Sequence, residues 1–570
     1  MNQKTVQLLN LFAGVFLTYI SANAQTLCSF PQSSGDLTAN NIEARISVAG
    51  DLFNKNSNAG FIYQPASNKP ATIFTSGLWM GGADDAGNVR LSAMSYRQGN
   101  ETEYSAGPLV PGATVPDPAA CSNWDRVFKV TKARIQAFSA DLSTLAANPQ
   151  VAISQYPDIM GWPGMDNPNF ESVYGFALPQ NVGLAPFIDT NGDGKYDPLS
   201  GDQPAVLLQG KTPFIPAQIL WCVFNDASAA HQISGGAPIN MEVQLTAWAL
   251  GPENTAPLNN TIFTSHKFVY RGVENINDFR VAFFTDFDLG CYLDDYIGSN
   301  PNKNYFFAYN QDAVDGNPGS NCSFGVPSFG AETPVQTATF LNRSMDNFIY
   351  MNNSSVGSSP VGTTDPNTVL EYFNYLQGRW RDGTSISLGG SGYDPAGTAT
   401  NYTFPDPPAD PNGWSMCTAN LPYNDQRTVA SSAIGLLQPG AVNELTMAWT
   451  IHPNVPGPCP NMDGVNDDVD VIQTAYDNSF EGLTPVVSVH NAAAWVQVAP
   501  NPARTAVTLN YGQLNVGAVR CFDMQGRLLY DNYTPAAGQQ TIPVHLWAAG
   551  TYVAQLTTDQ GLMPVRFVVE

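Results

Sequence analysis

The sequence predicts a mainly β protein with a few helices, in which a large body precedes a small seven-stranded β-sandwich. Two observations predict this fold class. Short segments of alternating polar and apolar residues, typical of half-buried strands, recur along the chain and end at Gly, Pro, Asn or Asp. The 570 residues also include 49 Gly and 43 Pro together with 11% aromatic residues, which is typical of a loop-rich but folded chain.

Residues 1–24 are expected to be a secretory signal peptide. Lys4 precedes an apolar stretch at 8–20, and Ala22 and Ala24 stand three and one positions before the expected cleavage at Gln25. The alternative is a membrane anchor, but a spanning helix needs roughly 20 apolar residues, more than this stretch provides. Because no other segment resembles a membrane span, we expect a mature chain without one, outside the inner membrane.

Charge composition narrows the classes of partner. Asp and Glu number 48 against 24 Lys and Arg, which gives a formal net charge of −24 at pH 7. A surface of this sign repels the phosphates of nucleic acids and of anionic lipids. We therefore expect no nucleic-acid partner, and a secreted protein that can recruit cations.

The body is expected to occupy residues 25–481, which is long enough for two subdomains, and a linker is expected at 482–494. Within the body, the Gly-, Pro- and Asn-rich stretch 387–414 predicts a long surface loop, either functional or simply solvated. The elements expected are helices at 123–145, 367–380 and 468–480, and strands that include 72–82, 241–250, 261–273, 279–290 and 443–451.

The eight cysteines show no metal-binding spacing. An exported chain can pair some of them, although the sequence alone leaves the connectivity open. Cys521 lies in an alternating strand pattern and is expected to be a buried small apolar residue.

From residue 495 onward, short strand candidates alternate with turns. Val507, Leu509 and Tyr511 share one face of their strand. Period-two burial with a turn about every ten residues is typical of a small immunoglobulin-like β-sandwich. The seven candidates are 495–499, 505–511, 516–523, 527–533, 540–546, 551–558 and 563–569.

Four ordered motifs in this module carry a family resemblance. They are VAPNPA (498–503), FDMQGRLL (522–529), LWAAGTYVAQL (546–556) and GLMPVRFVVE (561–570). Together they resemble the type A C-terminal sorting domain of the type IX secretion system of Bacteroidota. The motif residues that match are Pro500, Asn501, Pro502, Asp523, Gly526, Arg527, Gly550 and Tyr552.

The resemblance implies an export route and a set of partners. It implies that the type IX secretion machinery recognises the module at the outer membrane, and that a surface sortase removes it and often attaches the body to lipopolysaccharide. The protein is thus expected to be secreted or held at the outer cell surface. The family commonly ends in a basic residue, whereas Glu570 is acidic.

The segment DTNGDGKYD at 189–197 has the spacing of a calcium-binding loop. Oxygen-bearing side chains stand at positions 1, 3, 5 and 9, and Gly194 permits the sharp turn at position 6. Position 12, a Glu in an EF-hand loop, is Ser200 here. We expect structural Ca²⁺, and the alternative is an acidic turn without metal. The expected ligands are Asp189, Asn191, Asp193, Lys195 through its carbonyl, Asp197 and Asp202.

Other candidates for chemistry are less defined, and no catalytic residue is assigned. The segment 286–296 gathers Asp286, Asp288, Asp294 and Asp295, which fit a solvated loop, a metal site or acid–base catalysis of glycoside cleavage. The segment 221–231 holds Cys222, Asp226 and His231, but nothing in the sequence orients them as a catalytic triad. Tryptophans that could stack on sugar rings, although Trp is more often buried in a core, are Trp79, Trp162, Trp380 and Trp414.

Body segments such as TSGLWMGG, WCVFNDA and TDFDLGCYLDDYIG resemble a group of large, uncharacterised Bacteroidota surface proteins over most of residues 40–485. That resemblance implies one recurrent architecture and no known activity. The sequence favours a calcium-stabilised binding, adhesion or structural module at the surface, with a glycan or a surface protein as ligand. The alternatives are an extracellular hydrolase of polysaccharide or peptide and a component of a surface layer.

Overall fold

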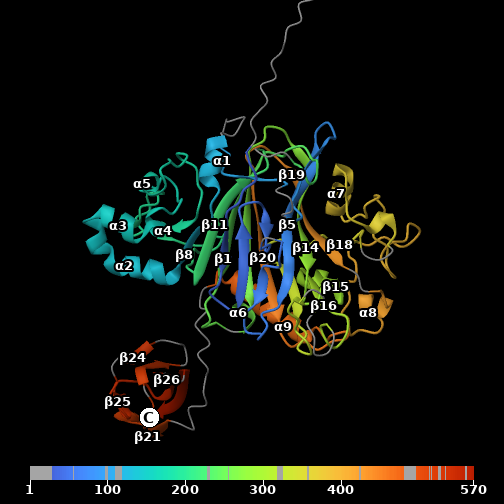
Figure 1. Ribbon diagram of the computed structural model, residues 1–570. Coiled ribbons are helices and arrows are strands. Elements are labelled where there is room, and N and C mark those ends of the chain that lie inside the picture. The colour runs from blue at the N-terminus through green and yellow to red at the C-terminus, as the bar shows by residue number, and fades with distance from the viewer. Residues whose placement is uncertain are drawn as a thin grey trace, which may run out of the picture.

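The computed structural model describes the chain from residue 28 to 480 and from 496 to 570, with short gaps (Figure 1). The expected signal peptide and the expected linker lie outside the described residues. The gaps are 56, 97–100, 110–117, 228–230, 255, 317–321, 323–324, 356–358, 423–424, 513, 515, 524–527, 533–534 and 559–560.

The body contains two antiparallel sheets of nine strands each. The strands of the first sheet are β1 (Ser34–Leu37), β2 (Ile42–Ser47), β3 (Asp51–Leu52), β4 (Phe61–Tyr63), β5 (Ala71–Asp84), β6 (Val89–Ala93), β14 (Ile276–Phe287), β18 (Asn347–Asn352) and β19 (Gln426–Leu437). They follow the order β1-β2-β3-β5-β14-β19-β18, with β4 pairing with β2 and β5, and β6 with β5. The long strands β5 and β14 form its centre.

The second sheet carries the surface on which a cavity is built. Its strands are β7 (Ser105–Ala106), β8 (Phe128–Thr131), β11 (Gln218–Asn225), β12 (Met241–Ala249), β13 (Thr261–Tyr270), β15 (Asp295–Asn300), β16 (Tyr305–Asn310), β17 (Val335–Phe340) and β20 (Val442–His452). Their order is β15-β16-β17-β20-β13-β12-β11-β7, and β8 pairs with β11.

Large aromatic side chains pack the two sheets face to face. The ring of Trp449 on β20 lies 5.1 Å from the ring of Phe53 and 5.3 Å from the ring of Phe283 on β14. A buried hydrogen bond also crosses between the sheets, from the Thr72 hydroxyl to Gln336 Oε1 at 2.6 Å. Side chains alternate between the two faces of each strand. One set packs into this core, and the other set faces outward, where helices and loops cover it.

Helices flank the sandwich on both sides (Figure 1). On one side, short helices and their loops cover β8 and β11, where Phe128 packs against Phe170 and Trp221. On the other side, α7 packs against β5 through Trp79 and Tyr372, whose rings are 5.1 Å apart. The helices are α1 (Pro118–Trp124), α2 (Lys132–Ala146), α3 (Pro149–Gln155), α4 (Pro157–Met160), α5 (Phe170–Tyr174), α6 (Ala256–Asn259), α7 (Val369–Leu376), α8 (Met416–Ala419) and α9 (Asp463–Asp477).

The single helix predicted at 123–145 is wrong in its first part. Residues 128–131 form β8 and pair with β11, and α2 begins only at Lys132. Phe128 and Val130 are buried while Lys129 between them is exposed, so the same residues fit a strand once β11 is beside them. The Thr131 side chain then accepts a hydrogen bond from Arg134 N and caps α2.

The terminal module is a β-sandwich of seven strands, as predicted. Its strands are β21 (Gln497–Ala499), β22 (Ala506–Asn510), β23 (Val516–Asp523), β24 (Leu528–Asn532), β25 (Gln539–Pro543), β26 (Gly550–Thr558) and β27 (Gly561–Val569). They form a sheet β21-β22-β25 and a sheet β24-β23-β26-β27. Val507, Leu509 and Tyr511 lie in a hydrophobic cluster that is separate from the core of the body.

Three disulfide bonds join described cysteines. Cys28 pairs with Cys121, Cys291 with Cys322, and Cys417 with Cys459. Cys222 and Cys521 are buried and unpaired, as expected for Cys521. This use of cysteine fits a protein that matures in an oxidising compartment.

We predict that Cys28–Cys121 stabilises the body more than either of the other two disulfide bonds. It links residues 93 positions apart, and a longer closed loop restricts the unfolded chain more. Loop-closure entropy gives about 4.6 kcal/mol for this bond, against about 3.7 kcal/mol for Cys291–Cys322, whose residues are 31 positions apart. Denaturant unfolding of the two double Cys→Ala variants measures both values. A smaller loss for the Cys28/Cys121 variant would contradict the prediction.

Candidate functional site

The predicted calcium loop lies between two short strands, β9 (Phe187–Ile188) and β10 (Gln203–Pro204), that pair with each other. Asp189 accepts hydrogen bonds from Gly192 N at 2.7 Å and Gly194 N at 2.8 Å. Both glycines have φ between +74° and +78°, a backbone conformation that other residues adopt only with strain. The loop therefore wraps tightly around the Asp189 carboxylate.

The far end of this loop is held by Asp202, whose side chain is buried. Its carboxylate accepts from Thr190 N and from Asp197 N, both at 2.8 Å. Asn191 and Asp193 accept from backbone groups two residues further on. The structure thus places all six predicted ligands in one loop, and their oxygen atoms are of the type that Ca²⁺ prefers.

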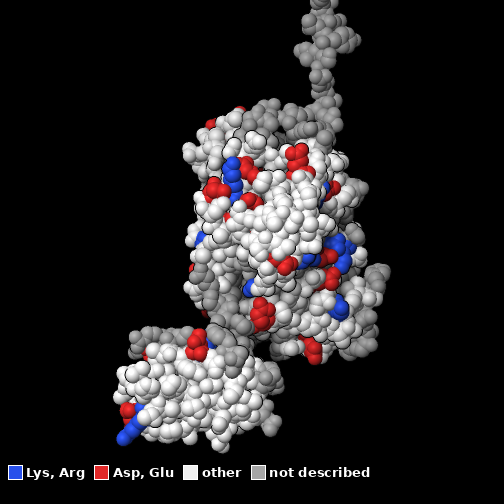
Figure 2. All heavy atoms as spheres, turned by 90° about the vertical axis from the view of Figure 1, so that its left-hand side faces the viewer, with Lys and Arg blue, Asp and Glu red and all other residues white. Residues whose placement is uncertain are grey.

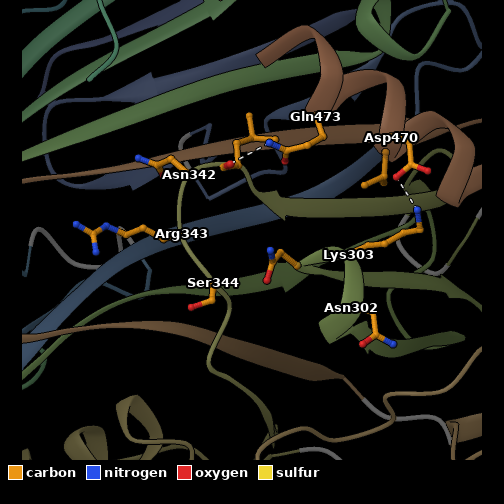
Figure 3. Close-up of a pocket in the computed structure, with 10 residues that line it drawn as sticks. Asn302, Lys303, Asn342, Arg343, Ser344, Asp470 and Gln473 are labelled. Atoms are coloured by element: carbon orange, nitrogen blue, oxygen red, sulfur yellow. Dashed lines mark hydrogen bonds and ion pairs between the residues drawn. The ribbon is translucent and has the colours of Figure 1, made fainter. Parts of the chain in front are cut away.

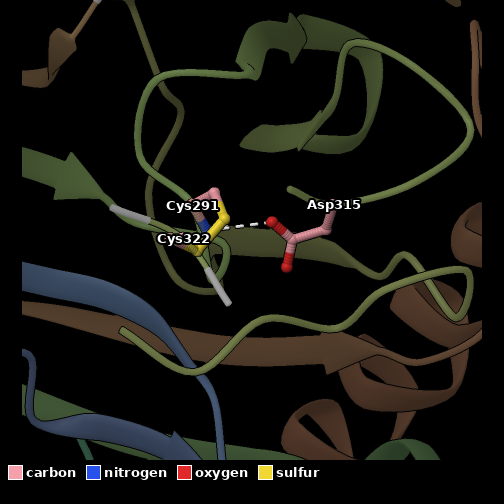
Figure 4. A group of neighbouring side chains, drawn as sticks. All are labelled: Cys291, Asp315 and Cys322. Atoms are coloured by element: carbon pink, nitrogen blue, oxygen red, sulfur yellow. Dashed lines mark hydrogen bonds between the residues drawn. A yellow bond between two sulfur atoms is a disulfide. The ribbon is translucent and has the colours of Figure 1, made fainter. Parts of the chain in front are cut away.

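No three acidic residues of this loop bring carboxylate oxygens within 4.8 Å of one another. Within the described ranges, the one group of three His, Cys, Asp or Glu ligand atoms within 4.8 Å of one another is Cys291, Asp315 and Cys322 (Figure 4). The two sulfurs of that group form a disulfide, so they are not thiolate ligands. Asp315 Oδ1 instead accepts a hydrogen bond from Cys291 N at 2.9 Å. The group therefore joins two loop segments and has a structural role.

A cavity of about 320 Å³ lies against the outer face of the second sheet, next to the predicted calcium loop. Its floor comes from neighbouring strands, because Gln244 on β12 stands opposite Lys267 on β13, which stands opposite Glu444 on β20. Two residues further along these strands, Trp221 on β11 stands opposite Thr246, which stands opposite Ser265. The rest of the wall is formed by Met165, Gly183, Leu184, Ala185, Pro186, Phe187, Asp189 and Leu207.

Glu444, one of two acidic residues that line this cavity, is held in place by hydrogen bonds. Both oxygens of Glu444 lie 3.3 Å from Gln209 N, and Thr446 donates its hydroxyl to Oε1 at 3.3 Å. Burial raises the pKa of Glu444 and lowers the pKa of Lys267. On the face shown in Figure 2, the few basic side chains stand near acidic ones and form no continuous basic patch.

A second, more open pocket of about 480 Å³ is lined by polar groups that already bond to one another (Figure 3). Lys303 Nζ lies 2.5 Å from Asp470 Oδ1, and Gln473 donates to the Leu341 carbonyl at 3.1 Å. The Arg343 guanidinium donates to the Glu444 carbonyl at 2.7 Å.

The aspartates of 286–296 do not form one catalytic centre. Asp286 accepts from the Tyr96 hydroxyl at 2.6 Å, and burial raises its pKa to about 7. Asp295 accepts from Leu289 N at 2.9 Å, and Asp294 accepts from Gly316 N at 2.9 Å. Burial, followed by the nearby Asp286 carboxylate, raises the pKa of Asp288.

The residues of 221–231 do not form a nucleophile and base. Asp226 accepts from Ile239 N and Met241 N, both at 2.6 Å, while both ring nitrogens of His231 lie 2.8 Å from backbone carbonyls. Cys222 is buried between the sheets, and burial raises the pKa of its thiol. The idea of sugar stacking is also wrong for four tryptophans, because all are buried: Trp79, Trp162, Trp380 and Trp414.

The terminal module closes on itself at the Pro-Asn-Pro element, Pro500-Asn501-Pro502. Asn501 Oδ1 accepts from Val568 N at 2.8 Å, and Ala503 bridges to Val569 on the last strand. Glu570 is 3.5 Å from Arg504, an exposed ion pair of small energetic value. The first and last sequence motifs are therefore in direct contact.

The other sorting-motif residues lie on the second sheet of the module or outside the described residues. Asp523 ends β23 and Gly550 begins β26. Tyr552 is buried beside Phe567, and its hydroxyl donates to the Ala548 carbonyl at 2.6 Å. Gly526 and Arg527 fall outside the described residues.

Solved structures resemble this chain at low similarity. A polysaccharide lyase is 10% identical over 70% of this chain and 41% of its own, with a TM-score of 0.17. The BSP domain of a biofilm-associated protein is 10% identical over 96% and 84%, with a TM-score of 0.14. Dimeric latent PorU from Porphyromonas gingivalis is 12% identical over 62% and 31%, with a TM-score of 0.10. The chain spans under half of the lyase, and these likenesses carry no inference.

No curated protein matches the chain. In the part of the chain that the structure describes, no helix is both long and apolar enough to span a membrane. One family matches, the secretion system C-terminal sorting domain, over residues 497–570. That match covers the whole seven-stranded module whose two ends meet at Asn501 and Val568. Residues 497–570 are thus a C-terminal sorting domain, and the protein is a type IX secretion cargo that reaches the cell surface or the extracellular space.

Proposed function

We propose that the body is a calcium-stabilised binding module displayed at the cell surface, with a glycan or another surface molecule as its ligand. The observation that carries this proposal is the cavity on the outer face of the second sheet. It combines buried polar groups from three strands with an apolar wall, which is the usual make-up of a small-ligand site.

The calcium loop and the cavity share a residue, which supports a joint role. Asp189 is the first residue of the loop and also lines the cavity. Three aspartates crowd the loop, at 189, 193 and 197, and a bound cation would relieve their mutual repulsion. Ca²⁺ held there would stiffen the adjoining cavity wall, Pro186 and Phe187.

A hydrolase is the less favoured alternative. Asp226 and His231 are engaged in structural hydrogen bonds, as the two backbone donors to Asp226 illustrate. Burial raises the pKa of Asp286 to about 7, which suits a general acid, but this carboxylate is held by the Tyr96 hydroxyl at 2.6 Å and by Arg427 at 3.8 Å. We therefore propose binding without turnover.

Binding without turnover is tested with the mature secreted chain on a glycan array and on a panel of polysaccharides and peptides. We expect retention on at least one class of glycan and no release of products. Turnover that is lost in Asp288→Asn or His231→Ala would instead support the hydrolase.

Calcium is expected to raise the thermal stability of the body. At about a hundred times its Kd, Ca²⁺ adds about 2.7 kcal/mol to the free energy of unfolding. Melting with Ca²⁺ and with EGTA, together with calorimetry, measures this effect.

The variant Asp193→Asn should lose most of the calcium effect, because it removes a charged ligand but keeps the acceptor for Lys195 N. The matched control is Asp410→Asn, since Asp410 makes the same kind of local bond to Asn412 N in another loop. Equal melting temperatures with Ca²⁺ and EGTA, and no heat of binding, would remove calcium from the proposal.

Export is expected to depend on the terminal domain. A chain that stops at residue 490 lacks all seven strands of the module and should stay inside the outer membrane, whereas the full chain appears in the extracellular and surface fractions. Immunoblots of cell fractions and of protease-treated cells measure the distribution. Normal amounts of the shortened chain outside the cell would contradict this expectation.

A further inference from the structure

The His231 ring bridges the two sheets of the body through two backbone carbonyls. Its Nδ1 lies 2.8 Å from the carbonyl oxygen of Leu91 on β6, in the first sheet. Its Nε2 lies 2.8 Å from the carbonyl oxygen of Asp226, which directly follows β11 in the second sheet. Only 1% of the side chain is exposed, so the protein itself has to satisfy both nitrogens.

These two contacts determine how many protons the ring carries. A backbone carbonyl oxygen accepts hydrogen bonds and cannot donate one, whereas a neutral imidazole has one N–H and one nitrogen with a lone pair. A neutral His231 would therefore turn a lone pair toward a carbonyl oxygen 2.8 Å away. Both contacts are hydrogen bonds only when both nitrogens carry a proton, and the ring is then a cation.

Asp226 supplies the first of two buried negative charges near this ring. Its carboxylate accepts from Ile239 N and Met241 N, both at 2.6 Å, and from the Ser92 hydroxyl at 2.9 Å. Each of these groups donates its hydrogen, so a proton on the Asp226 carboxyl would have no acceptor among them. The carboxyl group is therefore ionised.

Glu103 supplies the second negative charge, with its Oε2 4.0 Å from His231 Nδ1. Its carboxylate accepts from Ile233 N at 2.8 Å, from Ser234 N at 2.7 Å and from Ala93 N at 2.9 Å. The Ser234 hydroxyl donates to it as well, because that hydroxyl oxygen already accepts from a backbone N–H. Four donors thus surround Glu103, and this carboxyl group is ionised for the same reason.

The electrostatic balance favours the charged ring. Burial acts to lower the pKa of His231, but the Asp226 and Glu103 carboxylates and the two carbonyls outweigh it, so the pKa lies above its ordinary value. The other titratable groups nearby do not compete for this role. Arg90 is paired with Asp84 at 3.2 Å, and Glu101 is exposed. Burial raises the pKa of the neighbouring phenols, which stay neutral: Tyr104, Tyr270 and Tyr372.

We propose that His231 is an imidazolium at neutral pH and acts as a pH-sensitive link between the two sheets, which opens when alkaline pH removes one of its protons. A neutral ring would repel one carbonyl oxygen and leave two buried carboxylates without their cation. The closed arrangement holds segment 231–239 against β6, where Leu91 N donates to the Ala237 carbonyl at 3.0 Å. This segment should therefore separate from β6 as the pH rises.

Nuclear magnetic resonance of the full mature chain, with ¹⁵N only in histidine, reads the proton state directly. At pH 7.5 an ordinary histidine has lost most of its second proton, whereas the His231 ring should keep a slowly exchanging hydrogen on both nitrogens. Glu103→Gln removes one balancing charge and should move the loss of this proton to lower pH by about one unit or more, which assigns the signals. A His231 ring with a single proton at pH 7.5 would overturn the proposal.

Denaturant unfolding of the body between pH 6 and 10 gives an independent readout. The unfolded chain loses this proton near pH 6.5, so the stability that the link provides is complete below that pH and falls as the pH rises toward the higher folded-state pKa. Over that range the folding equilibrium constant of the wild-type chain should fall about tenfold per pH unit relative to His231→Gln, which has no proton to lose at this position.

The matched control is His266→Phe. Burial lowers the pKa of His266 to about 3, so this histidine is neutral throughout the range, and its ring already lies beside Phe268 and Phe283. The control should keep the pH dependence of the wild-type chain, whatever its stability. Parallel curves for the wild-type chain and His231→Gln would contradict the link. If His231→Gln does not fold, the titration of the wild-type ring decides.

Discussion

The packing of Trp449 between Phe53 and Phe283 is the contact on which the rest of the body depends. It lies where the middle strands of the two sheets face each other, so it fixes their separation and their alignment. Removing such a side chain from a core typically costs about 3 to 5 kcal/mol, a large part of the stability of a whole domain. Because the inner faces are filled in this way, polar residues at alternate positions of β12, β13 and β20 are sent to the outer faces.

The outer face of the second sheet is apolar at one end and polar at the other. Toward one end, Trp248 and Phe263 stack with their rings 5.3 Å apart and lie under Phe480, which follows α9. Four residues further along the same two strands, Gln244 and Lys267 stand opposite each other on the same face and line the cavity with residues 183–187. One end of this face therefore works as an extension of the core. The other forms the floor of a polar cavity, and the change happens within a few residues of the same strands.

Much of the fold was predictable because half-buried strands leave a period-two pattern. The segments 72–82 and 443–451 correspond closely to β5 and β20. Strand β16, which is buried along its whole length, lacks this alternation and was not predicted. The turn geometry of the acidic loop 189–202 was recognisable because its residues are contiguous. The cavity was not, because Trp221 and Lys267 are distant in sequence and meet only through the strand register, which a single sequence leaves open.

The contact between Asn501 and Val568 has a consequence for quality control. The module cannot close until the ribosome has added its last few residues, because the first motif bonds to the final strand. A chain that terminates before strand β27 therefore lacks a complete sorting domain, even if its body has folded. A transport system that recognises the closed module therefore does not recognise a chain that lacks strand β27.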